Sequence, residues 1–190
     1  MSPLACTRRQ ALCLLLSTAL GARANADDIE TPPEPPDYRL DNYRAPTPAT
    51  LSGARVVSTA EAHRLWSDKQ AIFIDVLPQA PRPADLPETV LWRDKPRFDI
   101  PGSIWLPDTG YGALAPEVER YFLEGLARAN VGDKGKPILF YCQRNCWMSW
   151  NAAKRALHSG YTNVIWYPEG TEGWSEEGYP FEERRPEPRE

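Results

Sequence analysis

The sequence predicts an α/β fold, a doubly wound sheet of about five mostly parallel strands with helices on both faces. Strand-like and helix-like segments alternate from residue 55 to residue 178. The runs at residues 71–76 and 137–141 are apolar almost throughout, which is typical of parallel strands buried on both faces. Ligands of such sheets bind beyond the carboxyl ends of the strands, so we expect functional residues just after these runs.

The first elements are a short strand at residues 55–57 and a helix that ends near residue 67. Ser58 and Glu61 have the spacing of a capping box, which predicts where this helix begins. The apolar strand at residues 71–76 follows and contains Asp75. Roughly two dozen proline-rich and charged residues then lead to a short strand at residues 103–106, and a connection of this length predicts a functional loop.

Pro116 begins the next helix, in which apolar residues recur at helical spacing and which Gly132 follows. The strand at residues 137–141, a loop with two cysteines and a helix over residues 149–159 come next, and Gly160 ends that helix. A strand at residues 163–167 and a short closing helix or turn at residues 169–178 complete the pattern. We therefore expect one domain over residues 51–182.

Residues 1–26 have the pattern of a secretory signal peptide, with Arg8 and Arg9 before an apolar stretch and small residues up to Ala26. The apolar stretch is too short to span a bilayer and no later segment is long enough, so we expect no membrane span. Ala11 stands where a twin-arginine signal usually has Phe, which favours ordinary export while leaving both routes open. The predicted mature protein is periplasmic or secreted.

Cleavage after Ala26 would leave about 164 residues, which suits a single domain with a full core. The basic residues would fall from 22 to 19 while all 26 acidic residues stay, giving a net charge of −7. This charge argues against nucleic acid as a partner. Cys6 and Cys13 would be lost, which leaves Cys142 and Cys146 as the only thiols in an oxidising compartment.

Two terminal segments contain few residues that a core could bury. Residues 27–50 are acidic and rich in proline, and they predict an extended arm or linker. Tyr38 and Tyr43 could hold the second half of this arm against the domain, so we expect disorder only in its first half. Residues 183–190 are highly charged and predict a disordered tail.

The segment Cys142-Gln143-Arg144-Asn145-Cys146-Trp147 joins the strand at residues 137–141 to a helix. Backbone N–H groups converge at a helix start and the helix dipole favours negative charge. We therefore expect Cys142 to ionise more easily than a free cysteine and to act as an anion-binding nucleophile. Arg144 can supply positive charge, and Asn145 tolerates a left-handed backbone.

Four stretches in this order resemble a rhodanese-like domain: residues 73–76, residues 99–107, residues 140–142 with the loop that follows, and residues 160–174. A closer resemblance is to an exported subfamily named for a Cys-x-x-x-Cys-Trp (CxxxCW) motif. That subfamily is associated with alcohol catabolism that depends on pyrroloquinoline quinone (PQQ). Residues 38–46 and 142–150 also take part in this second resemblance.

By resemblance, Cys142 takes a sulfane sulfur from a small donor, becomes a persulfide and passes the sulfur to a thiol acceptor, as in thiosulfate sulfurtransferases. Asp75 would either orient the loop or accept backbone N–H bonds. No cofactor is implied beyond the persulfide. A periplasmic quinoprotein dehydrogenase or its transport components are further candidate partners. Backbone N–H groups would cradle the anion, and they belong to Gln143, Arg144, Asn145, Trp147 and Met148.

Cys146 leaves two alternatives open. It could attack the inner sulfur of a Cys142 persulfide, release sulfide and close a labile disulfide, which would make it a resolving thiol. It could instead pack as a small apolar residue while Cys142 acts alone. The chain departs from the family pattern at Cys146, and also at Leu77 and Asp99, where many active members carry Arg and His.

Other residues are weaker candidates for a functional site. Two thiols without an adjacent histidine offer too few ligands for zinc, so we predict no metal site. Aromatic residues such as Trp147 and Trp150 more often belong to a core than to a pocket wall. Basic residues of the long connection could attract an anionic donor, but such a run is usually a solvated face; they are Arg82, Arg93, Lys95 and Arg97.

Two functions of different kinds therefore fit the sequence. The first is an exported sulfurtransferase or thiol redox protein that uses Cys142. The second is a non-catalytic module that binds an anion or a partner of a periplasmic quinoprotein system.

Overall fold

The computed structural model describes residues 31–93 and 95–189. The predicted signal peptide and residues 27–30 of the arm lie outside the described residues. The central sheet is parallel throughout and its strands are hydrogen-bonded in the order β1-β6-β5-β2-β4. Its members are β1 (Arg55–Val56), β2 (Ile72–Asp75), β4 (Ile104–Trp105), β5 (Ile138–Tyr141) and β6 (Val164–Trp166).

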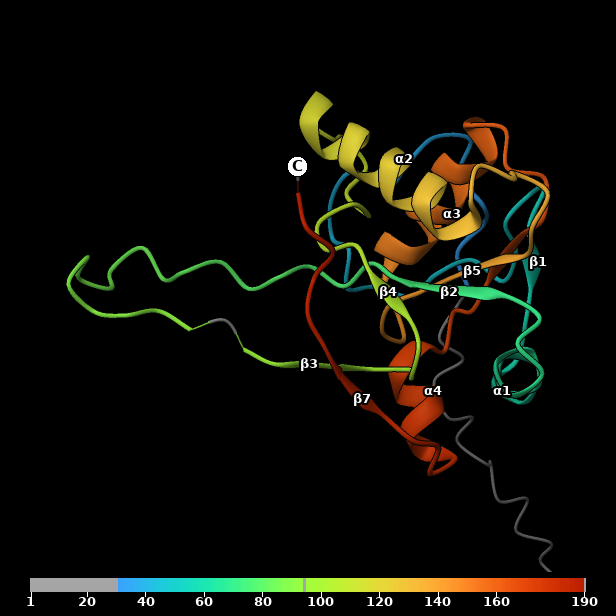
Figure 1. Ribbon diagram of the computed structural model, residues 1–190. Helices are drawn as coiled ribbons and strands as arrows, with labels where there is room; N and C mark the ends of the chain where they lie inside the picture. Colours follow the sequence, from blue (N-terminus) through green and yellow to red (C-terminus); the bar gives the residue numbers. More distant parts are fainter. Residues whose placement is uncertain (1–30, 94, 190) are drawn as a thin grey trace, which may run out of the picture.

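Helices cover both faces of this sheet. Figure 1 shows α2 and α3 on one side and α1 and α4 on the other. The predicted fold class is therefore confirmed. The helices are α1 (Thr59–Ser67), α2 (Pro116–Asn130), α3 (Trp147–His158) and α4 (Gly170–Glu176).

Alternation along the strands divides the core into two layers. Ile74 of β2 and Phe140 of β5 pack towards α2 and α3, whereas their neighbours Phe73 and Leu139 pack towards α1 and α4. All four side chains are buried. A strand that buries both faces needs apolar residues at every position, which explains the continuous apolar runs in the sequence.

The sequence signals for the starts of α1 and α2 are confirmed. The Ser58 side chain accepts the backbone N–H of Glu61, and the Glu61 carboxylate accepts the N–H of Ser58, so the predicted capping box is confirmed. Pro116 occupies the first turn of α2, as predicted. Helix α3 begins at Trp147, two residues before the predicted start, where the Trp147 N–H donates to the Tyr43 carbonyl at 2.9 Å.

A second, two-stranded sheet pairs β3 (Arg97–Asp99) with β7 (Glu182–Arg184) in antiparallel register. The sequence places β3 inside a long loop and predicts a disordered tail from residue 183. The structure instead orders residues 183–189 along the domain: the Glu187 N–H donates to the Trp105 carbonyl, and Arg189 forms an ion pair with Asp108 at 2.6 Å. These contacts bridge about eighty residues of sequence or more, so local composition gives no sign of them.

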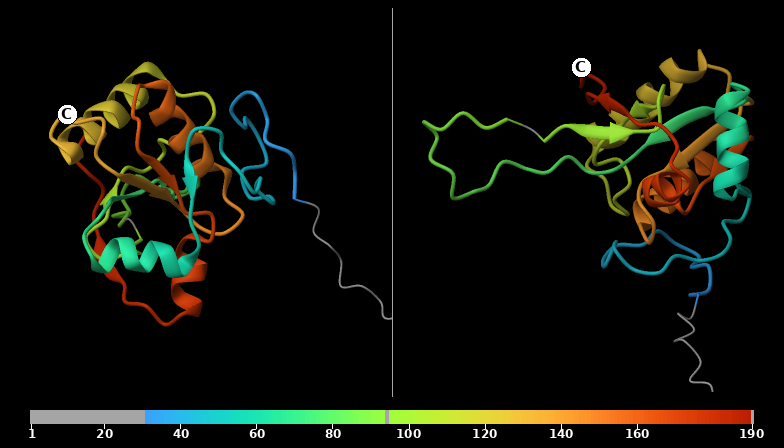
Figure 2. Two further views of the ribbon diagram at one scale, coloured as in Figure 1. Left: turned by 90° about the vertical axis from the view of Figure 1, so that its right-hand side faces the viewer. Right: turned by 90° about the horizontal axis from the view of Figure 1, so that it is seen from below.

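The arm lies against the start of α3 and the cysteine loop (Figure 2). The indole N–H groups of Trp147 and Trp150 donate to the carbonyls of Pro46 and Thr50. The Lys154 ammonium donates to the carbonyl of Pro36 at 2.6 Å, so the docked part of the arm begins earlier than predicted. A proline-rich segment has few backbone N–H donors and forms no regular hydrogen-bonded element of its own, so its carbonyls remain available to these α3 side chains.

The long connection between β2 and β3 extends away from the rest of the domain (Figure 1; Figure 2, right). Its tip is organised by Arg82, whose guanidinium donates to the carbonyl of Pro87 at 2.6 Å. Leu91 leaves 78% of its surface exposed. None of the described helices is long and apolar enough to cross a membrane.

Asn151 of α3 fixes the arm, and we expect Asn151→Ala to release it. The buried Asn151 amide exchanges two hydrogen bonds with the backbone of Arg39 and also donates to the Gly110 carbonyl at 3.0 Å. Loss of these bonds should lower the free energy of unfolding by about 1–3 kcal/mol, measured by urea denaturation. Proteolysis within residues 31–45 should become faster. Asn163→Ala, at an exposed position, is the matched control, and equal effects of both variants would contradict this role of Asn151.

Candidate active site

The two cysteines lie at opposite ends of the turn that joins β5 to α3. Cys142 follows the last residue of the central strand β5, and Cys146 is the N-cap of α3. Both thiols are free; Cys142 has no exposed surface and Cys146 exposes 2%. The fold therefore brings the two sulfurs together at the carboxyl edge of the sheet, where ligands of such sheets bind.

The two thiols are hydrogen-bonded to each other. Burial raises the pKa of Cys142 well above its ordinary value, and its S–H donates to Cys146. That hydrogen bond, with the N–H groups of Met148 and Gln143 and the nearby charge of Arg44, lowers the pKa of Cys146 to about 6. The raised pKa favours the neutral thiol at Cys142, and the lowered pKa favours the thiolate at Cys146.

The predicted cradle of backbone N–H groups is divided between several acceptors. Gln143 and Met148 direct their N–H groups to the sulfurs. The Arg144 N–H donates instead to the Glu172 carboxylate at 2.9 Å, and the Trp147 N–H is taken by the arm. The Arg144 guanidinium pairs with Glu169 and Glu176, so its charge is directed away from the cysteines.

The backbone of the turn needs two special conformations. Asn145 has a φ of 55°, the left-handed region that asparagine tolerates better than most residues. Gly170, at the start of α4, has a φ of 53° and packs directly on the turn. A Cβ atom there would lie 2.7 Å from the Cys142 carbonyl oxygen and 2.8 Å from the Cα of Gln143. Any side chain at position 170 would therefore displace the cysteine turn.

Asp75 ends β2 beside the cysteine turn and forms a buried ion pair with Arg97 of β3. The Arg97 Nε and Nη2 atoms both lie 2.6 Å from the same carboxylate oxygen, and the second oxygen accepts the Leu77 N–H at 2.8 Å. Burial raises the pKa of Asp75 in spite of this pairing. The charges of Asp75 and Arg97 both act on Cys142.

Asp99 is buried without a hydrogen-bond partner. Neither of its carboxylate oxygens is hydrogen-bonded, and its nearest cation is the Arg184 Nε at 3.7 Å. Burial and the charge of Asp75 raise the pKa of Asp99 to about 7. Tyr141 is anchored close by, because its hydroxyl donates to the Ser103 Oγ at 2.7 Å.

A pocket of about 300 Å³ borders the cysteine turn. Gln143 and Thr171 form its inner side, and Thr171 is held there by the bond from its N–H to the Cys142 carbonyl. Arg97 lies on the same pocket, and the exposed rings of Phe98 and Phe181 stand at its rim. A larger cavity of about 710 Å³, beside Trp66 at the opposite end of β2, lies away from the cysteines.

The structure therefore unites Cys142, Cys146, Gln143, Met148 and Asp75 around one centre. Arg97 belongs to a charged run that predicts a solvated face, but the structure places it beside Cys142. Its signal was the alternation of Arg97, Phe98 and Asp99, which leads into the matched segment at residues 99–107 and is a strand pattern with charged residues on one face. Among the described residues, no group of three or more His, Cys, Asp or Glu is placed to hold a metal ion.

We expect Asp99→Asn to stabilise the protein at alkaline pH more than at acidic pH. The fold raises the pKa of Asp99 from its ordinary value of 3.8 to about 7. The folded chain therefore binds more protons than the unfolded chain between these values, and stability falls as pH rises through this range. Asp99→Asn removes this loss, so the free energy of unfolding of the variant at pH 8 should exceed that of the wild type by about 1–3 kcal/mol.

Urea denaturation at pH 5 and at pH 8 measures the difference. The exposed Asp85 is the matched position, and Asp85→Asn should change stability equally at both pH values. A gain from Asp99→Asn that is the same at both pH values would show that the carboxylate does not titrate as described.

Several solved structures resemble the fold at low sequence identity. An uncharacterised protein from Saccharomyces cerevisiae shares 23% identity with a TM-score of 0.39, covering 67% of this chain and 95% of that one. A polysulfide-sulfur transferase homodimer from Wolinella succinogenes shares 18% identity with a TM-score of 0.44, over 70% and 82%. An EanB persulfide intermediate with ergothioneine shares 20% identity with a TM-score of 0.49, over 75% and 34%.

Among curated proteins, no sequence matches this chain significantly. The model of the family described as "Rhodanese-like domain" matches residues 58–177. This stretch contains β2, the cysteine turn and α4, and it amounts to more than half of the chain. The protein therefore belongs to the rhodanese-like domain family.

Proposed function

We propose that the protein is a sulfurtransferase in which Cys142 is the nucleophile and Cys146 is its base. One arrangement carries this proposal: two free, buried thiols lie at the ends of the turn that leads into α3, and the interaction between them raises the pKa of Cys142 and lowers that of Cys146. A thiolate that accepts the proton of a neighbouring thiol activates it at the moment of attack. The family fold supplies the context for this chemistry.

In the first step, the Cys142 sulfur attacks the sulfane sulfur of a donor such as thiosulfate while its proton moves to Cys146. The S–S bond of thiosulfate breaks, sulfite leaves with the bonding electrons, and Cys142 becomes a persulfide anion. A thiolate acceptor then attacks the outer sulfur, and Cys142 leaves as a thiolate. The N–H of Gln143 and the charge of Arg97 lie close enough to stabilise the negative charge on these sulfurs.

We further propose that Cys146 resolves the persulfide when no acceptor is bound. After the first step Cys146 is a neutral thiol next to the persulfide. Attack of its sulfur on the inner sulfur of Cys142 would form the Cys142–Cys146 disulfide and release hydrosulfide, with no other oxidant required. The hydrogen bond between the two thiols favours this reaction because it already holds the sulfurs in contact.

The proposed setting is the periplasm, in association with PQQ-dependent alcohol catabolism. The support is the signal-like segment at residues 1–26 and the resemblance to the exported CxxxCW subfamily. The two parts of that resemblance touch in the structure. The Tyr43 carbonyl accepts the Trp147 N–H, and Arg44 forms a β-bridge with Cys146.

A non-catalytic binding module is the second candidate function. Its support is the complete burial of Cys142 and the engagement of Arg144 with Glu169 and Glu176, which leaves that guanidinium unavailable for an anionic donor. Such a module would hold a partner of a quinoprotein system without exchanging sulfur.

Sulfur transfer predicts a gain of one sulfur atom on Cys142. Reduced protein incubated with thiosulfate and weighed intact should gain that mass, and Cys142→Ser should not. Cys146→Ser should gain it more slowly, by about tenfold or more, because it lacks the base. The wild-type rate should fall as pH drops through about 6, where Cys146 becomes protonated, and Cys146→Ser should lack this step.

The same measurement decides between the candidates. If thiosulfate, polysulfide and glutathione persulfide all fail to add sulfur, the binding module is favoured. If Cys142→Ser still gains sulfur while Cys146→Ser does not, the two roles are reversed.

Resolution predicts a disulfide after the sulfur-loaded protein stands without an acceptor. The protein should lose the added sulfur, release sulfide and lose two hydrogen atoms in intact mass. Cys146→Ser should keep its persulfide under the same conditions. Alkylation of both thiols after incubation, with no sulfide released, would rule out the resolving role of Cys146.

A further inference from the structure

Strand β3 has its charged face inward. Arg97 and Asp99 alternate with Phe98, and in a strand alternate side chains point to opposite sides. Asp99 has no exposed surface and the Arg97 side chain exposes 10%, whereas Phe98 exposes 53%. A register shifted by one residue would bury the ring and solvate the charges. The observed register leaves the Phe98 ring exposed. The ion pair between Arg97 and Asp75 holds β3 in this register.

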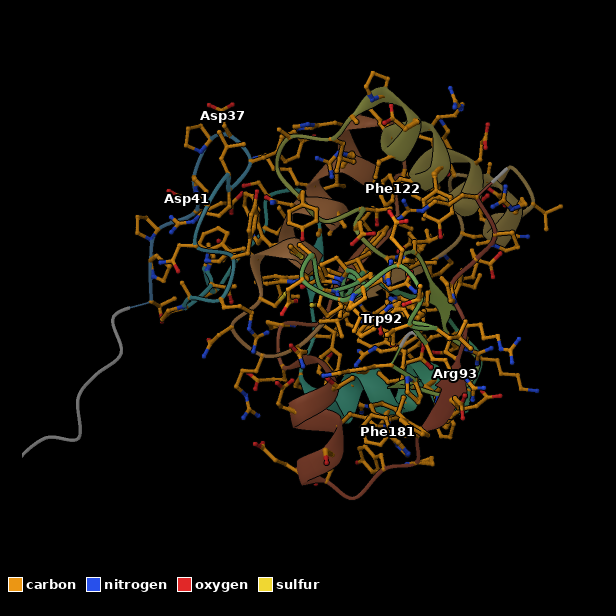
Figure 3. All side chains as sticks on the ribbon, turned by 90° about the vertical axis from the view of Figure 1, so that its left-hand side faces the viewer. Asp37, Asp41, Trp92, Arg93, Phe122 and Phe181 are labelled. Atoms are coloured by element: carbon orange, nitrogen blue, oxygen red, sulfur yellow. The ribbon has the colours of Figure 1, made fainter. Side chains whose placement is uncertain are left out.

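A second exposed ring lines the same pocket. Phe181 directly precedes β7 and exposes 37% of its surface. Figure 3 shows it between α4 and β7. Both rings border the pocket of about 300 Å³ whose lining also includes Gln143 and Arg97. Two exposed aromatic rings around one pocket beside the cysteine turn are a feature that fold stability does not require.

The arm covers the other side of the turn. Arg44 forms its β-bridge with Cys146 and lies 3.8 Å from the Glu172 carboxylate, which borders the same pocket. The lining of the pocket therefore combines two aromatic rings with the cation of Arg97 and the amide of Gln143. A compound with an apolar ring and an anionic sulfur matches this combination, because ring contacts are apolar and a thiolate is stabilised by positive charge.

We propose that this pocket is the acceptor subsite and that the acceptor is a small thiol with an aromatic group, held between Phe98 and Phe181. The inference rests on the proposed sulfur transfer and specifies its acceptor. The acceptor thiolate attacks the outer sulfur of the Cys142 persulfide, Cys142 leaves as a thiolate, and the product is an aromatic persulfide. Arg97 orients the attacking sulfur through its charge.

The test compares acceptors on protein already loaded from thiosulfate. The acceptors are phenylmethanethiol, 2-mercaptoethanol and cyanide. Discharge, the loss of the added sulfur from Cys142 to the acceptor, is followed by intact mass. The variants Phe98→Ala and Phe181→Ala should each raise the KM for phenylmethanethiol about tenfold with little change in kcat. Discharge by 2-mercaptoethanol and cyanide should stay within about twofold. Phe98→Tyr should restore most of the loss, and Leu91→Ala, at an exposed residue of the long connection, is the matched control.

Equal effects on all three acceptors, or no effect on any, would overturn the aromatic subsite. Failure of thiosulfate, polysulfide and glutathione persulfide to load the wild-type protein would refute the proposed function instead. Binding of phenylmethanesulfonate to the reduced protein, measured by titration calorimetry, still decides the subsite in that case. Binding that weakens about tenfold in Phe98→Ala supports the subsite; no binding, or binding unchanged by the variant, overturns it.

Discussion

The buried ion pair between Asp75 and Arg97 is the contact on which the candidate site depends. It joins the end of β2 to β3, and β3 carries β7 and the chain end with it. A buried charge left without its partner is strongly destabilising, so neither residue can be replaced alone at low cost. The pair sets the register that turns Phe98 outward, and it places a cation beside Cys142. The cation at the pocket and the outward ring of Phe98 therefore have a common cause.

The cysteine turn shows how burial and hydrogen bonding can separate the properties of two identical side chains. Desolvation disfavours charge on both sulfurs, but Cys146 receives the S–H of Cys142 and two backbone N–H groups. Burial is the main cause of the raised pKa of Cys142, and the interaction with Cys146 raises it further. A position at the start of a helix does not by itself produce a thiolate at Cys142. The direction of individual N–H groups decides where the charge lies.

The arm contributes to the same centre from the far side. Proline-rich composition predicts an extended segment, and the segment is extended, but its carbonyls are acceptors for Trp147, Trp150 and Lys154. Helix α3 thus offers one side to the core and its polar groups to the arm. The arm holds the cysteine turn closed against solvent through the bridge between Arg44 and Cys146.

The sequence by itself determined the layered α/β fold, the starts of α1 and α2 and the meeting of the cysteine turn with a sheet edge. These features follow from local periodicity, capping residues and apolar runs, which act over a few neighbouring residues. Only the tertiary structure decided the pairing of β3 with β7, the place of Arg97 beside Cys142, and the opposite directions of the pKa shifts at the two cysteines. Each depends on groups from distant parts of the chain whose burial and hydrogen bonds exist only after folding, as with the Asp75 carboxylate that selects Arg97 from four basic residues of one loop.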